Sequence, residues 1–305
     1  MLAGLGSFST RVGRSLLLSP CILALPMIPF LHIGSLAIPT FGLMVASAMV
    51  CAYFLLRADL QRRKLAPDKL SAAAMAEVFI AVPCLSGIVG AKLYHELQSP
   101  AEFFAHPLRQ LFSQYGFAWF GGLIAGFLAY IWLARMRKIP ILVMLDAGSP
   151  AAALGYAVGR IGCLLSGDGD YGTPTPLPWG MSFPNGLVPT TARVHPTPIY
   201  EFLAACLIAW ILWRLGRKQI DARVSRATTK QARSGVVFAA YLILTGLERF
   251  LVEFIRINPR SFLGMSNAQT AGLLCLIVGF AEMWRLAYSP TRVSTAPAPR
   301  RRAGK

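Results

Sequence analysis

The sequence predicts an all-α membrane protein that crosses the bilayer seven times. Of its 305 residues, 55% are apolar and only 14% are charged, and its mean hydropathy is +0.54. A soluble domain of this length has about a quarter charged residues. The apolar residues form runs of about twenty, the length of a membrane-spanning helix, whereas the strands of a membrane barrel have about ten residues that alternate in polarity. The pattern therefore predicts helices and excludes a barrel.

The chain opens with a leader, residues 1–37. Two arginines precede an apolar stretch, as in a signal peptide, but Pro20, Pro26 and Pro29 interrupt that stretch and no small-residue cleavage site stands out. We expect the leader to lie at the membrane interface or to be partly inserted in the bilayer.

Residues 38–288 form the predicted seven-helix membrane domain. Its spans are Phe41–Leu56, Ala72–Leu93, Tyr115–Ala134, Ile141–Leu165, Ile199–Leu215, Gly235–Ile255 and Ala268–Ala287. Charged residues mix with phenylalanines and leucines in residues 94–113, which favours a short amphipathic helix on the membrane surface. Gly121, Gly122 and Gly126 in the third span have the spacing of small residues at close helix contacts.

Two segments are predicted to be irregular. The loop 166–196 is rich in Gly, Pro, Asp and Thr, and the basic tail 289–305 is rich in Pro and Ala, a composition typical of disorder. Six scattered cysteines show neither a CxxC pair nor a His spacing, so they indicate neither a disulfide framework nor a metal site.

The basic residues predict the orientation of the chain. Of the 30 Lys and Arg residues, 21 lie at or after the ends of the first, third, fifth and seventh spans. Because cytoplasmic loops carry the excess of Lys and Arg, this places the N-terminus outside and the C-terminus in the cytoplasm. The net charge of +17 is thus explained by topology, and we predict no nucleic-acid partner.

One cation stands inside apolar sequence, directly before a polar loop. Arg160 belongs to GRIGCLLSGDGDYG at Gly159–Gly172. An arginine near the bilayer centre costs about 2.5–3.5 kcal/mol on insertion scales, so it needs a partner, a cavity or an anionic ligand. The alternative is an arginine at the interface whose side chain reaches out of a helix end.

The sixth span carries a second charged group. Arg249, Glu253 and Arg256 are spaced i, i+4 and i+7, which predicts one stripe on a helix. With Arg160 and Lys92 they make four cations against two obvious acids, Glu201 and Glu253. This predicted surplus of positive charge favours a site for an anionic lipid on the outer face, where arginines would grip a phosphate. A structural ion triad that neutralises itself is the alternative.

Several motifs resemble those of the prolipoprotein diacylglyceryl transferase family. They are FGLM at Phe41–Met44, VGAKLY at Val89–Tyr94, FGGLIAG at Phe120–Gly126, GRIGCLLSGDGDYG, HPTPIYE at His195–Glu201 and GLERFLVEFIR at Gly246–Arg256. The resemblance runs in order over residues 38–287. It implies seven helices, no metal or other cofactor, and the transfer of a diacylglyceryl group from phosphatidylglycerol to the lipobox cysteine of a prolipoprotein.

The resemblance also implies residue roles. Arg160 and Arg249 would hold the phosphate while negative charge develops on the leaving oxygen, and Glu253 would complete the catalytic group. Lipid-binding roles fall to Lys92, which replaces the usual arginine, and to Gly172, His195, Glu201 and Arg256. HPTPIYE has a simpler explanation as well, because two prolines followed by a glutamate form an ordinary helix start.

Besides Lys92, the sequence departs from the family at three further positions, and its outer loop carries an extra residue and two acids, Asp168 and Asp170. Phe120 stands where the family has a histidine that is often assigned as thiol base, Phe41 replaces a tyrosine, and Cys163 replaces an asparagine. Nearby cations lower a thiol pKa, so catalysis without a dedicated base is one possibility. The other candidates for the proton acceptor are three residues of the outer loop and its flanks: His195, Glu201 and Asp168.

Two other functions are compatible with the sequence. The missing histidine and tyrosine suggest a divergent relative that binds phosphatidylglycerol or modifies another acceptor. Buried charges also mark transporters of anions, although the two halves of this chain show no internal repeat.

Overall fold

The computed structural model describes residues 27–98, 100–111, 113, 116, 118–224 and 233–288. The basic tail and most of the leader therefore lie outside the described residues. Within the described part, six helices are long and apolar enough to cross a membrane: α1 (Thr40–Arg62), α2 (Lys69–Gln98), α5 (Trp119–Met136), α6 (Ile141–Ser166), α7 (Thr197–Val224) and α9 (Asn267–Tyr288). A further helix, α8 (Val236–Val252), has 17 residues and falls just short of that length. The predicted class, a mostly helical membrane protein, is confirmed.

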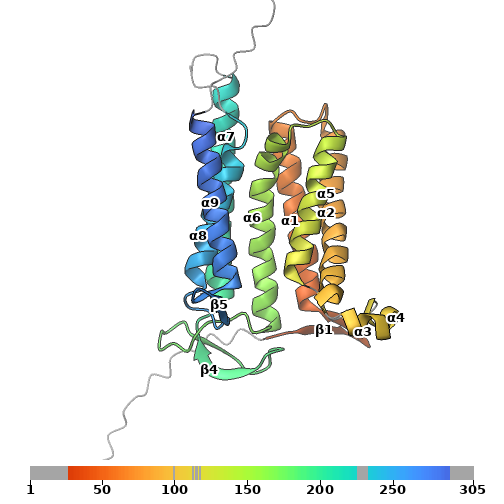
Figure 1. Cartoon of the computed structure of the whole chain (residues 1–305), viewed down its shortest axis with the longest axis vertical. Coiled ribbons are helices and arrows are strands. Elements are labelled where there is room, and N and C mark those ends of the chain that lie inside the picture. Colours follow the sequence, from red (N-terminus) through yellow and green to blue (C-terminus); the bar gives the residue numbers. More distant parts are fainter. Residues whose placement is uncertain are drawn as a thin grey trace, which may run out of the picture.

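Short elements complete the fold at one end of the bundle. The residues between α2 and α5 include two short helices, α3 (Pro100–Ala105) and α4 (Pro107–Leu111), where one surface helix was predicted. Three antiparallel hairpins pair β1 (Phe30–Ile33) with β2 (Leu36–Pro39), β3 (Met181–Phe183) with β4 (Thr190–Val194), and β5 (Arg260–Phe262) with β6 (Met265–Ser266). Figure 1 shows these elements at its lower end. These hairpins were not predicted from the sequence.

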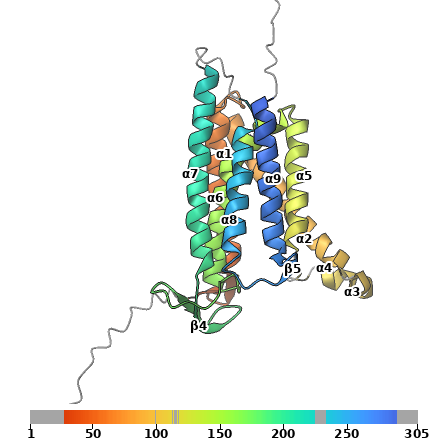
Figure 2. The ribbon, with the colours of Figure 1, turned by 60° about the vertical axis from the view of Figure 1, so that its left-hand side comes forward.

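Helix α6 occupies the centre of the bundle. It lies between a group formed by α1, α2 and α5 and a group formed by α7, α8 and α9 (Figure 1). Figure 2 shows the bundle turned so that α7 and α8 lie toward the viewer. Helix α1 runs antiparallel to α6. A Cβ on Gly162 would lie 3.2 Å from the ring of Phe41, whereas Arg63 approaches the carbonyl of Asp146 at the other end.

Glycines bring α2 and α5 into backbone contact. A Cβ on Gly90 would lie 2.6 Å from the carbonyl oxygen of Gly121, and one on Gly121 would lie 2.4 Å from that of Gly90. Further along, a Cβ on Gly126 would lie 3.1 Å from the carbonyl oxygen of Pro83. The predicted close packing through small residues of the third span is thereby confirmed.

A buried carboxylate fixes the start of α8 against α6. Asp146 is fully buried and accepts hydrogen bonds from the backbone N–H groups of Gly235 at 2.8 Å and Phe238 at 2.9 Å, and from the Gln219 amide at 2.8 Å. A carboxylate suits a helix start, where backbone N–H groups lack partners inside the helix. Helix α8 is thus held on α6 far from the hairpin end, which helps to set the position of the charged residues at its other end.

Candidate active site

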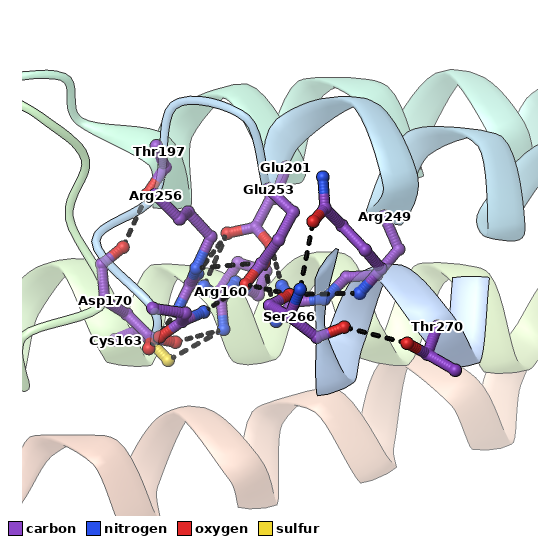
Figure 3. A network of polar contacts seen from close by, with 12 residues as sticks. Arg160, Cys163, Asp170, Thr197, Glu201, Arg249, Glu253, Arg256, Ser266 and Thr270 are labelled. Carbon is purple, nitrogen blue, oxygen red and sulfur yellow. Dashed lines mark hydrogen bonds and ion pairs between the residues drawn. The ribbon is translucent and has the colours of Figure 1, made fainter. Parts of the chain in front are cut away.

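Arg160 is buried near the end of α6 and points into a cluster of charged groups (Figure 3). Its Nη2 lies 2.5 Å from Oε2 of Glu201, and its Nη1 lies 2.6 Å from Oδ2 of Asp170. Helix α6 ends two turns later at Gly167, whose φ of 56° is the left-handed conformation that favours glycine. The chain then turns back, which allows Asp170 to reach Arg160.

Glu201 is the centre of the cluster. It stands in the first turns of α7 and is fully buried. Its Oε1 accepts from Nη1 of Arg249 at 2.8 Å and from the Tyr156 hydroxyl at 3.0 Å, and its Oε2 also accepts from Nη1 of Arg256 at 3.2 Å. Together with Arg160, three guanidinium groups from separate segments therefore share one carboxylate.

Arg249, Glu253 and Arg256 come together, but not as a stripe on one helix. Helix α8 ends at Val252, three residues before the predicted end, and Glu253 is its C-cap. The backbone N–H groups of residues 254–256 bond three residues back, which tightens the last turn. Oε2 of Glu253 lies 3.3 Å from Nη2 of Arg249 and 3.6 Å from Nε of Arg256. The three charged groups are therefore close together, as predicted, although the helix ends before Arg256.

Gly172 brings the loop into register with Arg256. The two residues form an isolated antiparallel bridge, and the N–H of Gly172 donates to the carbonyl of His195 at 2.9 Å. A Cβ on Gly172 would lie 2.5 Å from the carbonyl oxygen of Ile255. The Thr197 hydroxyl donates to the Asp170 carbonyl at 2.5 Å. Gly172 thus positions Asp170 and Arg256 through the backbone.

The predicted surplus of positive charge is wrong for the described residues. Arg160, Arg249 and Arg256 meet three carboxylates: Glu201, Glu253 and Asp170, the last of which also pairs with Nη2 of Arg256. Asp170 was noted as a loop acid but was not placed at the arginines, because a loop without periodicity does not reveal where its side chains point. Each of the three guanidinium groups therefore has a carboxylate partner among the described residues.

Two aspartates of the loop differ in their proton affinity. Burial acts to raise the pKa of Asp170, but the guanidinium groups of Arg160 and Arg256 outweigh it and hold this pKa below its usual value. Burial raises the pKa of Asp168, and the charge of Asp170 raises it further. The carboxylates of Asp168 and Asp170 and the Cys163 sulfur lie within 4.8 Å of one another. Asp168 is therefore the better proton acceptor of the two.

Two residues predicted to bind substrate have contacts of their own. Lys92 is buried on α2, with Nζ 3.4 Å from Oε1 of Glu96 and 3.3 Å from the carbonyl of Ser113. Nδ1 of His195 lies 3.3 Å from the Tyr200 hydroxyl. These contacts place the Lys92 ammonium in a second ion pair and turn the His195 ring toward Tyr200.

Two further residues contact the carboxylates of the cluster and were not predicted from the sequence, Tyr156 and Ser266. Tyr156, which donates to Glu201, stands four residues before Arg160 and so shares its helix face, a signal that was available. Ser266 begins α9 in an S-x-x-Q capping box: its hydroxyl accepts from the N–H of Gln269, whose side chain accepts from the N–H of Ser266. The same hydroxyl donates to Oε1 of Glu253 at 2.8 Å.

This arrangement is suited to binding an anionic group and to stabilising further negative charge that develops on it. Three guanidinium groups offer planar forks of N–H donors at one place, and two of them also pair with Asp170, whose side chain is 32% exposed. A model of the family described as prolipoprotein diacylglyceryl transferase matches residues 29–285. The chain belongs to this family.

Individual relatives are similar in sequence to this chain over most of their length. A protein of Geobacter sulfurreducens is 35% identical over 243 residues, which cover 77% of this chain and 84% of that protein. Proteins of Clostridium tetani and a Polaromonas species are 32% and 31% identical, covering 78% and 88% of this chain and 89% and 96% of their own lengths. Each of the three is named phosphatidylglycerol–prolipoprotein diacylglyceryl transferase.

The side chains predicted to depart from the family pattern lie on three different helices, α1, α5 and α6. Phe41 begins α1 against Gly162 of α6, and Phe120 packs edge-on against Trp119 at the start of α5. Cys163 accepts from Nη1 of Arg160 at 3.4 Å. Cys163 therefore stands beside Arg160, at the position where the resemblance predicted an asparagine, and the ion pairs of Arg160 are present.

Proposed function

We propose that this protein transfers the diacylglyceryl group of phosphatidylglycerol to the thiol of a prolipoprotein lipobox cysteine and releases glycerol phosphate. The observation that carries this proposal is the meeting of Arg160 and Arg249 on one buried carboxylate, Glu201, in a member of the transferase family. The names of the relatives supply both substrates.

The geometry suggests how the arginines act. A thiolate attacks the glycerol carbon next to the phosphate, a sulfur–carbon bond forms, and the carbon–oxygen bond breaks so that its electron pair leaves on the phosphate. Arg160 and Arg249 stabilise the charge that develops there, because they are fixed before the reaction by Glu201. Asp170 is the group that the phosphate displaces, since it already offers its carboxylate oxygens to Arg160 and Arg256 as an anion.

The cluster narrows the choice of proton acceptor for the thiol. Both oxygens of Glu201 are already occupied by arginine and tyrosine donors, and the His195 ring faces Tyr200. Asp168 borders the cluster beside Asp170, and burial raises its pKa. We therefore assign Asp168 as the proton acceptor.

Replacing Asp168 by asparagine is expected to lower kcat by about 10²-fold, the low end of general-base contributions. Because the Asp168 pKa is raised, activity of the unaltered protein should fall at less acidic pH than an ordinary aspartate would give. Asp168→Asn should lose this acidic limb, whereas His195→Gln should keep it. Rates measured across pH test this, and loss of the limb in His195→Gln alone would move the role to His195.

The full topology belongs to this proposal. We infer that α8, the sixth span in chain order, also crosses the membrane, because it contacts both α7 and α9, and that this brings the number of spans to seven. We also infer that the arginine cluster lies at the outer face of a bacterial cytoplasmic membrane. The basic loops then face the cytoplasm. Labelling of a cysteine placed at Pro67, between α1 and α2, should require a reagent that crosses the membrane; labelling by an impermeant reagent from outside would contradict this orientation.

Two measurements test the reaction itself. Membranes that contain the protein should convert a lipobox peptide when phosphatidylglycerol is supplied, and the gene should restore lipoprotein maturation in cells depleted of their own transferase. Lipid binding without either activity would identify the divergent relative considered above. Movement of an anion across sealed vesicles with no lipid consumed would identify a transporter and refute the proposed reaction.

A further inference from the structure

An open cavity of about 290 Å³ lies between α1 and α2, far from the arginine cluster. It is lined by Phe54, Arg57, Ala58, Gln61 and Lys69. These residues belong to the end of α1 and the start of α2. Since α1 runs antiparallel to α6, this end of the bundle lies beside Asp146, opposite Arg160.

The two cations of the cavity lack acidic partners in the described part of the chain. The neighbouring arginines at the end of α1 do have an acidic partner, because Arg62 and Arg63 both pair with the buried Asp59. Neither Arg57 nor Lys69 has such an ion pair among the residues that the structure places. The cavity is therefore a place where two positive charges meet without internal neutralisation.

The acid nearest to Lys69 in sequence is also engaged elsewhere. Asp68 accepts hydrogen bonds from the backbone N–H groups of Leu70 and Ser71, each at 2.8 Å, and from the Ser71 hydroxyl at 2.8 Å. It caps the start of α2, as an aspartate before a helix commonly does. An anion from outside the chain is then the natural partner for the two cations.

We place the end of the apolar helix α1 at the membrane surface, which puts the cavity in the headgroup layer of a bilayer. Arg57 stands five residues before the end of α1, which is about 7.5 Å along a helix. The polar layer on each side of a bilayer is about 5–8 Å thick. Phe54, one turn deeper and 57% exposed, then lies at the level of the glycerol and the first acyl carbons.

We propose that this cavity binds the headgroup of an anionic glycerophospholipid in the leaflet away from the arginine cluster. Arg57 and Lys69 pair with the phosphate, Gln61 donates its amide, and Phe54 covers the start of an acyl chain. Basic pockets between helices on the cytoplasmic side suit such headgroups. No bond is made or broken there, so the proposal is independent of the transfer reaction.

Lipid binding to the purified full chain tests this site, with phosphatidylserine as the probe and phosphatidylcholine as the uncharged comparison. Bound lipids are counted by native mass spectrometry during a titration. Arg57→Gln with Lys69→Gln should weaken the binding of one phosphatidylserine about thirtyfold, since each cation near the surface contributes about fivefold. Phosphatidylcholine binding should not change.

The matched control is Arg137→Gln with Lys138→Gln, two exposed cations just after α5 at the same end of the bundle. It removes the same charge away from the cavity and should leave binding unaltered. Equal loss in both double variants would show general charge attraction and overturn the site, as would no loss in either.

Phe54→Ala separates a lipid from free phosphate, the other source of the same chemistry. It should weaken phosphatidylserine binding severalfold, and inorganic phosphate at millimolar concentration should not displace the lipid. Displacement by inorganic phosphate, or binding that is indifferent to Phe54, would overturn the lipid assignment. Peptide conversion should remain normal in all these variants. Because lipid binding is measured without the transfer reaction, this test of the cavity stays valid even if the proposed reaction is wrong.

Discussion

Replacing Arg160 by alanine is expected to abolish conversion of a lipobox peptide, with a fall in kcat of at least about 10²–10³-fold. This is the range seen when one fixed donor to a developing oxyanion is removed. Arg160 is the only residue of α6 in the described cluster that pairs with both Glu201 and Asp170, so its loss removes donors and also frees two carboxylates. Initial rates with saturating phosphatidylglycerol measure the effect.

Two further variants separate chemistry from folding. Arg160→Lys keeps the charge that balances Glu201 but loses the planar fork, so it should fold normally and still lose most of kcat. Arg260→Ala removes an exposed arginine of β5 at the same end of the bundle and should retain full activity. Normal conversion by Arg160→Lys would show that the fork is not needed at this position.

The sequence predicted the parts of this protein that follow from periodicity and hydropathy. Apolar runs predicted the long helices, and the spacing of Gly121, Gly122 and Gly126 predicted a close helix contact, although not that α2 is the partner. Arg160 and Arg249 could be singled out because a cation within an apolar run is costly and needs a reason. Their meeting at Glu201 required the fold, since those three residues come from three helices.

The rest depended on backbone geometry that no local pattern reveals. Asp170 reaches Arg160 only because α6 ends in a left-handed glycine and Thr197 fixes the returning loop. Arg256 appeared to continue a helical stripe, but the chain leaves the helix after Val252 and pairs with Gly172 instead. The predicted surplus of positive charge was wrong for the same reason, because the third carboxylate, that of Asp170, comes from a loop.

Replacing Glu201 by alanine is expected to destabilise the protein by about 3–5 kcal/mol, the usual effect of removing one partner from a buried ion pair. Three guanidinium groups and the Tyr156 hydroxyl would lose their shared acceptor at once. The free energy of unfolding, measured with denaturant in detergent micelles, should report this loss. Activity should vanish as well, because Arg160 and Arg249 would no longer be held together.

A charge test distinguishes this role of Glu201 from simple packing. Glu201→Gln keeps the size and one acceptor oxygen but removes the negative charge, so it should still be strongly destabilised if the carboxylate offsets the arginines. Asp221→Asn removes a carboxylate charge in the same way at an exposed position near the end of α7 and should be close to neutral. Addition of phosphatidylglycerol should partly restore the stability of Glu201→Gln, because the lipid phosphate supplies negative charge to the same guanidinium groups. Equal stability of Glu201→Gln and the unaltered protein would mean that Asp170 and Glu253 alone balance the cluster, and the central place given to Glu201 would be wrong.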